Sequence, residues 1–163
     1  EGEQARVRHS TENLEACALA VEAHSLFETY TLENIAKARN LFKQAVDLDP
    51  KYAYAWSYLG LTYWIDGVYH SAHYDREKSF ESALKMAQKA LSVDPKSSDA
   101  HALLSSVYLS QKKYDEAEAF GKKTINLDPN SSENHAIVAI LMQNIGKFEE
   151  AIALVKQAMR PEK

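Results

Sequence analysis

The sequence predicts an all-α solenoid in which about four antiparallel helix hairpins stack beside one another. A triplet of apolar residue, aspartate and proline recurs at Leu48-Asp49-Pro50, Val93-Asp94-Pro95 and Leu127-Asp128-Pro129. An alanine stands twelve residues before each proline, at Ala38, Ala83 and Ala117. Only 5 glycines and 4 prolines occur in 163 residues, which favours long helices over many short strands.

Small residues also recur five positions before each proline, at Ala45, Ala90 and Thr124. Together with the alanines twelve positions before each proline, they define a repeat frame. Carried forward by one more repeat length, the frame predicts small residues at 151 and 158, where Ala151 and Ala158 are found. Two closely packed helices need a small side chain wherever the facing helix presents a bulky one. The frame therefore describes the second helix of each hairpin, and the proline ends that helix.

The first helix of each hairpin carries large, apolar, small and large residues at helical spacing. The three copies are Trp56-x-x-Leu59-Gly60-x-x-Tyr63, His101-x-x-Leu104-Ser105-x-x-Tyr108 and His135-x-x-Val138-Ala139-x-x-Met142. Because His101 and His135 occupy the position of Trp56, we expect both histidines at a hairpin interface.

This pattern resembles the tetratricopeptide repeat, a helix–turn–helix unit of about 34 residues. The repeats run at about 11–51, 52–97, 98–131 and 132–163, within a single domain at 1–163. The first has a longer turn, Glu28 to Glu33, and the last ends in Arg160-Pro161. The second holds an 11-residue insertion, near Asp66 to Arg76, because its prolines, Pro50 and Pro95, are more widely spaced than one repeat. We leave open whether this insertion forms a lid.

The resemblance implies a right-handed superhelix whose concave groove is lined by the first helix of each repeat. Aromatic residues gather in repeat two, with six of nine tyrosines and both tryptophans between 52 and 74. Aromatic side chains carry much of the binding energy at protein interfaces. The predicted partner-binding residues are Tyr54, Tyr58, Leu61, Trp64, Ile65, Asp99, Ser106, Ser110, Ile140 and Asn144. We expect Trp56 and Tyr63 to fill the hairpin core instead.

The groove positions also predict the chemistry of the partner. Tetratricopeptide domains that grip chaperone C-termini use Lys, Arg and Asn there, whereas this chain has Ser57, Leu61, Asp99 and Leu103. Acidic tails are therefore disfavoured. Asp99 and Glu133 favour a protein or peptide that is apolar or mildly basic.

Composition excludes several other classes of function. The net charge is -4 and the basic residues are scattered among acids, so we expect no nucleic-acid partner. No apolar run is long enough to span a bilayer, and no leader is visible. Cys17 is the only cysteine, which excludes an internal disulfide and fits a cytoplasmic protein.

Chemical motifs are sparse. His70-x-x-His73-x-Asp75 has suitable ligand types for a metal, but nothing nearby completes a site, so we predict no metal and no cofactor. No nucleophile elbow, phosphate-binding glycine loop or Cys-x-x-Cys pair occurs, and we expect no enzyme.

Two functions remain. The leading hypothesis is a protein–protein interaction scaffold or adaptor whose groove binds a peptide or helix of a partner. The alternative is a regulatory or self-association segment of a larger signalling protein. The layout of repeats one and two resembles the arrays attached to bacterial class III nucleotide cyclases and winged-helix regulators, and the chain starts at Glu1 without methionine. Ile152 and Val155 on the last helix are predicted to face outward, which fits a homo-oligomer.

Overall fold

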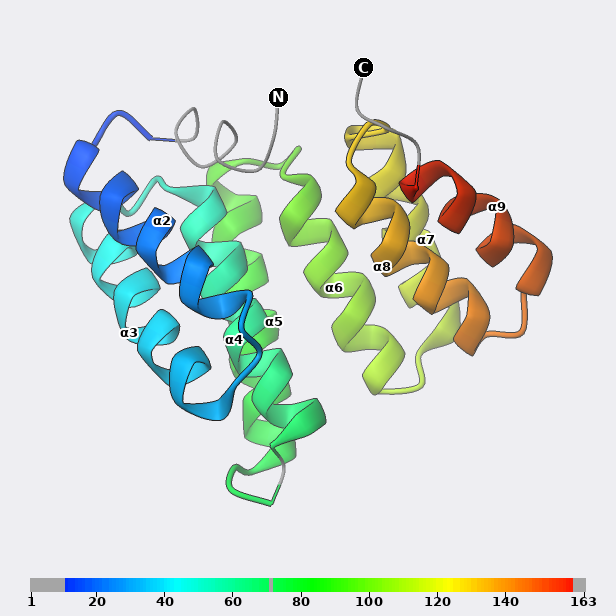
Figure 1. The fold of residues 1–163 in the computed structure, drawn as a ribbon, viewed down its shortest axis with the longest axis horizontal. Coiled ribbons are helices and arrows are strands. Elements are labelled where there is room, and N and C mark those ends of the chain that lie inside the picture. The colour runs from blue at the N-terminus through cyan, green and yellow to red at the C-terminus, as the bar shows by residue number, and fades with distance from the viewer. Residues whose placement is uncertain (1–10, 71, 160–163) are drawn as a thin grey trace. The chain divides into compact units, whose positions relative to one another are not determined.

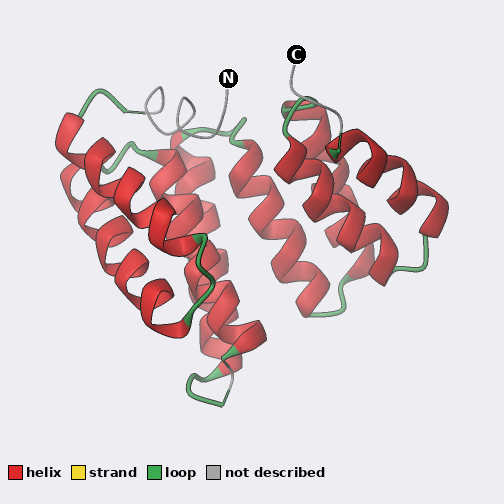
Figure 2. Cartoon of the chain, viewed as in Figure 1, coloured by secondary structure: helices red, strands yellow, loops and turns green. Residues whose placement is uncertain are grey.

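The computed structural model describes residues 11–70 and 72–159, and within them every regular element is an α-helix (Figure 2). The predicted end of the last repeat at Arg160-Pro161 lies outside the described residues. The helices are α2 (Leu14–Phe27), α3 (Leu32–Leu48), α4 (Ala53–Tyr69), α5 (Arg76–Val93), α6 (Ser98–Ser110), α7 (Tyr114–Leu127), α8 (Ser132–Asn144) and α9 (Phe148–Ala158). Successive helices pair as antiparallel hairpins (Figure 1), which confirms the predicted all-α fold.

The described residues form two compact units, with the division after Ala100. The first unit holds the hairpins α2–α3 and α4–α5. The second holds most of α6, together with α7 and the hairpin α8–α9. The single domain and the handedness expected of a superhelix stay predictions.

The recurring Asp-Pro pair ends one helix and turns the chain toward the next. Asp49 and Asp94 follow α3 and α5 with extended backbone, the conformation that a following proline favours, and Asp128 follows α7 with similar backbone angles. The N–H of each aspartate donates to the carbonyl of the small residue four positions earlier, at Ala45, Ala90 and Thr124. The carbonyl of each then accepts from the N–H three positions later, at Tyr52, Ser97 and Ser131. The repeated sequence is thus a repeated turn.

The turns inside two hairpins are also copies of each other. Lys112 and Gly146, which stand at the same position of successive repeats, both have positive φ, at 61° and 83°. The next N–H in each turn, from Lys113 or Lys147, donates to a carbonyl five residues earlier. This hydrogen bond satisfies a carbonyl that the helix end would otherwise leave without a donor.

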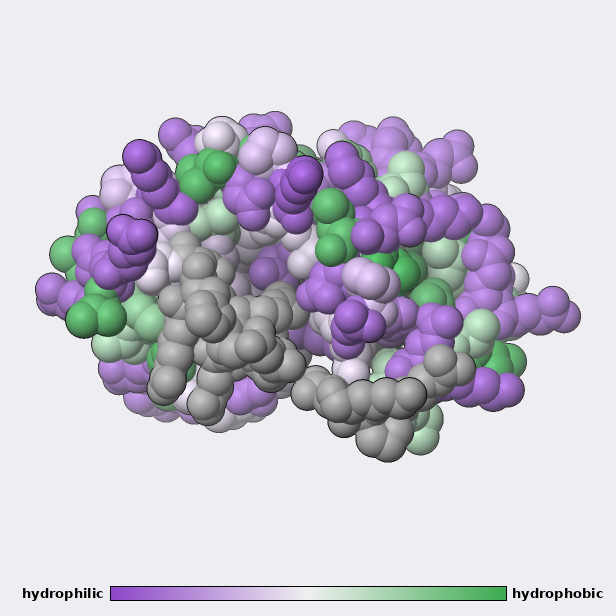
Figure 3. Space-filling view, turned by 90° about the horizontal axis from the view of Figure 1, so that it is seen from above, coloured by the Kyte–Doolittle hydropathy of each residue, from purple (hydrophilic) through white to green (hydrophobic). Residues whose placement is uncertain are grey.

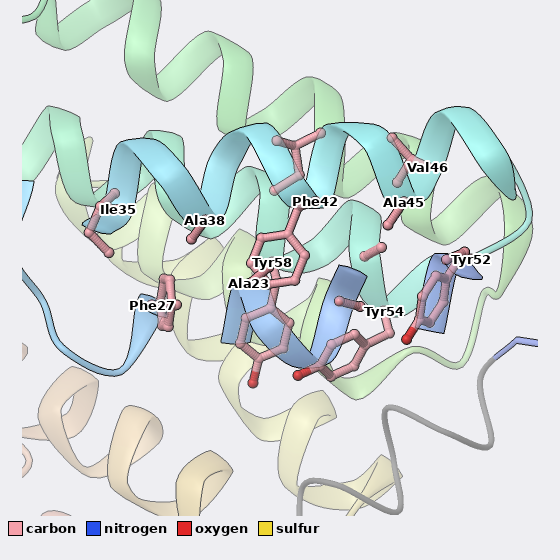
Figure 4. Close-up of a cluster of buried hydrophobic side chains, with 14 of the residues drawn as sticks. Ala23, Phe27, Ile35, Ala38, Phe42, Ala45, Val46, Tyr52, Tyr54 and Tyr58 are labelled. Carbon is pink, nitrogen blue, oxygen red and sulfur yellow. The ribbon is translucent and has the colours of Figure 1, made fainter. Parts of the chain in front are cut away.

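The core of the first unit lies between α2, α3 and α4 (Figure 4). Alanines on α2 and α3 allow these helices to approach closely, and aromatic rings from three helices fill the remaining space. The Tyr58 ring meets Phe27 edge-on at 5.6 Å and lies tilted against Phe42 at 5.7 Å. Burying each ring contributes about 1.5–3 kcal/mol, so this cluster stabilises the unit strongly.

The insertion in the second repeat lengthens a hairpin. Helix α4 has 17 residues and α5 has 18, whereas α6 and α7 have 13 and 14. Each helix therefore gains about one turn, and only residues 70–75 lie between the two. Gly67 on the added turn packs tightly against the ring of Phe80 on α5. Of the eleven extra residues, eight are accounted for by the longer helices, four in α4 and four in α5.

The second unit is built around small residues that face bulky ones. Gly121 on α7 lies against Leu141 of α8, and the Ser105 hydroxyl donates to the Ala117 carbonyl at 2.8 Å. His101 and His135 are both buried, and the contact of His101 with α7 agrees with its predicted place at a hairpin interface, which stays a prediction for His135. His101 lies 5.9 Å from the Phe120 ring. Substituting histidine for the tryptophan of repeat two therefore preserves a packing position.

Candidate partner-binding surface

The predicted partner-binding residues on α4 fall into two groups. Tyr54, Tyr58 and Ile65 are buried members of the core cluster. Leu61 and Trp64 are half-buried and pack against the same cluster. Trp56 and Tyr63, which were expected in the core, are also half-buried against it. The more accessible part of the predicted surface on α4 is therefore formed by Leu61 and Trp64.

The two buried tyrosines form a stacked pair one helical turn apart. Their ring centroids are 4.4 Å apart, and the Tyr54 hydroxyl lies 2.9 Å from Nδ1 of His24 on α2. His24 also meets the Tyr58 ring edge-on at 5.1 Å. Tyr52 stacks on Tyr54, and burial raises the pKa of the Tyr52 hydroxyl above its usual value. These contacts hold α4 in one orientation against α2.

An accessible aromatic edge lies near the C-terminal end of α4. Trp64 meets the ring of Tyr69 edge-on, with centroids 6.2 Å apart. Tyr69 is 67% exposed, and Leu61 lies one turn before Trp64. We call Leu61, Trp64 and Tyr69 the aromatic edge. Leu61 and Trp64 were predicted from the sequence, whereas Tyr69, which belongs to the turn that the insertion adds, was not.

The remaining predicted residues lie on α6 and α8. Asp99, Ser106 and Ser110 are half-buried. Each of these serine hydroxyls donates to a carbonyl of its own helix at 3.0 Å. Ile140 is 58% exposed, and the Asn144 side-chain amide donates to its carbonyl at 2.7 Å. The predicted positions on α8 are thus open to solvent.

A buried charged network in the first unit was not predicted. Arg39 on α3 forms an ion pair with Asp66 of α4, and it also donates to the Thr62 hydroxyl at 3.1 Å. The tyrosine rings of Tyr63 and Tyr74 lie 4.6 and 5.7 Å from the guanidinium. The sequence feature that could have indicated this network is the single aspartate in the otherwise uncharged stretch Trp64 to Tyr69. A charge there needs a buried partner, but the sequence does not say which arginine supplies it.

Two of the three residues weighed as metal ligands, His70 and Asp75, have other side-chain contacts. His70 Nδ1 lies 3.3 Å from a carboxylate oxygen of Asp66. Asp75 caps the start of α5, and the N–H of Lys78 that bonds it lowers the pKa of its carboxyl. Among residues 11–70 and 72–159, no group of three or more His, Cys, Asp or Glu is placed to hold a metal ion.

The surface is mostly hydrophilic in the view of Figure 3, where apolar residues form small separate patches. Within the described part of the chain, no helix combines the length and apolar character needed to cross a bilayer.

Comparison with known families and structures agrees with this geometry. A family model for the anaphase-promoting complex, cyclosome, subunit 3 matches residues 76–158, just over half the chain, and a TPR repeat model matches residues 29–67. The fold defines a protein of the helix-hairpin repeat class. More specifically, the chain belongs to the tetratricopeptide repeat family. Repeats of this family generally mediate protein–protein interactions.

Solved structures share the fold. TTC0263, a thermophilic TPR protein in Thermus thermophilus, has a TM-score of 0.75 and 23% identity, covering 96% of this chain and 78% of its own. The MamA protein has a TM-score of 0.56 and 21% identity over 88% of this chain and 71% of its own. The Arabidopsis OM64 TPR domain has a TM-score of 0.60 and 16% identity over 79% of this chain and 95% of its own. Identities this low establish the fold alone. The search of curated proteins found no match.

Proposed function

We propose that the chain is a scaffold or adaptor that binds a peptide or helix of a partner protein and catalyses no reaction. The observation that carries the proposal is the aromatic edge of Leu61, Trp64 and Tyr69 on a helix of a tetratricopeptide array. Aromatic side chains offer a large contact area for little lost conformational entropy, which makes them effective binding anchors.

The core beneath this edge supports the proposal. Tyr54, Tyr58 and Ile65 are buried, and they fix α4 against its neighbours. A partner that packs on Leu61 and Trp64 therefore meets a preformed surface and does not have to order it. In this proposal the buried residues contribute indirectly, by holding the edge in place.

Positions on α6 and α8 are proposed as further contacts. Asp99, Ser106 and Ser110 offer polar groups, and Ile140 and Asn144 are exposed. The carboxylates of Asp99 and Glu133 would repel an acidic tail. We therefore propose a partner segment that is apolar or mildly basic.

A regulatory or self-association segment of a larger signalling protein is the second candidate. The observation that favours it is the apolar side of the last helix, where Ile152 and Val155 are 56% and 45% exposed. Apolar residues gathered on one exposed helix side mark a surface for another protein.

Affinity capture from the host's lysate tests the scaffold proposal. The bait is this chain beside Leu61→Ala/Trp64→Ala, with Tyr114→Ala as a matched control at an exposed aromatic on α7. Circular dichroism confirms that each variant is folded. A protein retained by the native chain and the control, but lost from the double variant, supports the aromatic edge as the binding surface. Equal retention by all three, or by none, contradicts it.

A further inference from the structure

The last helix carries an exposed apolar stripe. Phe148, Ile152, Val155 and Met159, at its C-cap, are 62%, 56%, 45% and 78% exposed. Their spacings of four, three and four residues place them on one side of α9. We call these four residues the α9 stripe. The same spacing marks the seam of two helices that pack lengthwise.

The stripe is separate from the side of α9 that packs within the second unit. Ala151 and Leu154 belong to the cluster shared with α8. At about 100° of turn per residue, the stripe lies roughly 100° around the helix from these two. Figure 1 shows α8 against one side of α9 only. The α9 stripe is therefore a second apolar side of one helix.

We propose that the α9 stripe docks against the α9 stripe of a second copy of the chain, with the two helices antiparallel. In this arrangement Ile152 packs on the partner's Val155 at the centre, and Phe148 packs on the partner's Met159 at each end. Because the spacing reads the same from both ends, a two-fold axis matches every apolar residue with another. This deepens the self-association candidate and does not use the aromatic edge.

Charge selects the antiparallel direction. Glu149 and Lys156 are exposed and seven residues apart, so both lie along the same edge of the stripe, on the side away from α8. An antiparallel pair brings Glu149 beside the partner's Lys156 twice, once on each side of the two-fold axis. A parallel pair would set this edge against the side of the partner's α9 that packs on α8. It would form neither charge pair.

A helix of a further repeat would compete for the same face. One repeat earlier, Gly121 stands at the position of Val155, and there α8 packs on α7 through Leu141. That occupant needs only an apolar face, whereas the paired positions of Glu149 and Lys156 match a second α9. The charges therefore favour docking of a second copy. If the face instead takes a helix of a further repeat, the native chain is expected to stay monomeric.

Mass in solution, measured by sedimentation equilibrium over a wide range of protein concentration, tests the proposal. The native chain is expected to dimerise, and Ile152→Glu is expected to remain a monomer that circular dichroism shows to be folded. Tyr114→Glu is the matched control, because Tyr114 is exposed to a similar degree on α7 and lies outside both proposed surfaces. It should dimerise like the native chain. A native chain that is monomeric throughout, or a dimer that survives Ile152→Glu, overturns the proposal.

Charge exchange tests the direction. Glu149→Lys and Lys156→Glu each place like charges together twice, so each should raise the dimer dissociation constant about tenfold at low salt. The double exchange restores opposite charges and should return the constant to near the native value. Failure of the double exchange to restore it would contradict antiparallel docking. The capture experiment with Leu61→Ala/Trp64→Ala is independent, so either proposal can fail alone.

Discussion

Arg39 on α3 and Asp66 on α4 form an ion pair in which the aspartate side chain is only 2% exposed. The arginine also donates to the carbonyl of Thr62 at 2.9 Å. It therefore links the second helix of one hairpin to the first helix of the next. Removing two charges from water is costly, so this pair contributes stability only while both members remain.

Asp66→Ala should lower the free energy of unfolding by roughly 3–5 kcal/mol, because it leaves the Arg39 guanidinium largely buried without its carboxylate. Urea denaturation measures the change. The double variant Arg39→Met/Asp66→Leu should lose less free energy of unfolding than the sum of the losses from Arg39→Met and Asp66→Leu alone, since it leaves neither charge without its partner. Strict additivity would mean that the two side chains do not act as a pair.

Gly67→Ala should destabilise the first unit by about 1–3 kcal/mol. A Cβ at residue 67 would lie 2.6 and 2.9 Å from two atoms of the Phe80 ring, which is itself buried. Thermal unfolding measures the loss. Phe80→Leu supplies the control, because a smaller side chain should make the added methyl less harmful. If Gly67→Ala lowers stability by the same amount with Phe or with Leu at position 80, contact with the ring is not the cause.

The stability of the second unit should depend on pH through Glu118. Hydrogen bonds from Lys122 and then Lys147 hold the pKa of this carboxyl below its ordinary value of 4.5. A lowered folded pKa contributes stability above the ordinary value and loses it as pH falls through the folded pKa. The advantage of the native chain over Glu118→Gln should therefore be present near pH 7 and shrink as the pH falls below 4.5.

Unfolding free energies of the native chain and Glu118→Gln, compared across that range, measure this effect. Glu81→Gln, at an exposed carboxylate on α5, is the control for a general change in net charge. A difference between Glu118→Gln and the native chain that stays constant with pH would contradict the prediction.

Asp94→Ala should lower the free energy of unfolding by about 1 kcal/mol. Its carboxylate accepts from the N–H of Lys96 at 2.9 Å and closes the turn after α5. Asp94→Asn keeps an acceptor oxygen at the same place, so it should lower the free energy of unfolding much less than Asp94→Ala. Chemical denaturation compares the two. Equal losses would show that charge, and not the hydrogen bond, stabilises this turn.

The repeat pattern predicted the helices because each hairpin is specified by local signals. The Asp-Pro turns and the alanines of the second helices occupy the expected places, and the two histidines at the tryptophan position are buried. The length of α4 and α5 was not predicted. The wider proline spacing of the second repeat resembles a loop insertion in the sequence, although one extra turn on each helix absorbs most of it.

The candidate surface was less predictable, because family position does not determine exposure. Tyr54 and Trp64 were both expected to face a groove, yet Tyr54 is buried and Trp64 is half-buried. The difference depends on neighbours from another hairpin, such as His24, which lies 30 residues earlier in the chain. A single sequence does not give contacts at that separation. The outward side of α9 followed from helical period alone, and Ile152 and Val155 are exposed as expected.

The Asp-Pro turns have a consequence for how such chains grow and are redesigned. Asp49 and Asp94 each close their turn with hydrogen bonds to residues no more than four positions away, and the Asp49 carboxylate accepts one further bond, from the Thr11 hydroxyl. A short gene segment that encodes such a turn therefore also encodes most of the residues that stabilise it. Duplication, deletion or transplantation of a hairpin between two such junctions should preserve both ends. The junctions are therefore natural splice points for building a longer or shorter array from this chain.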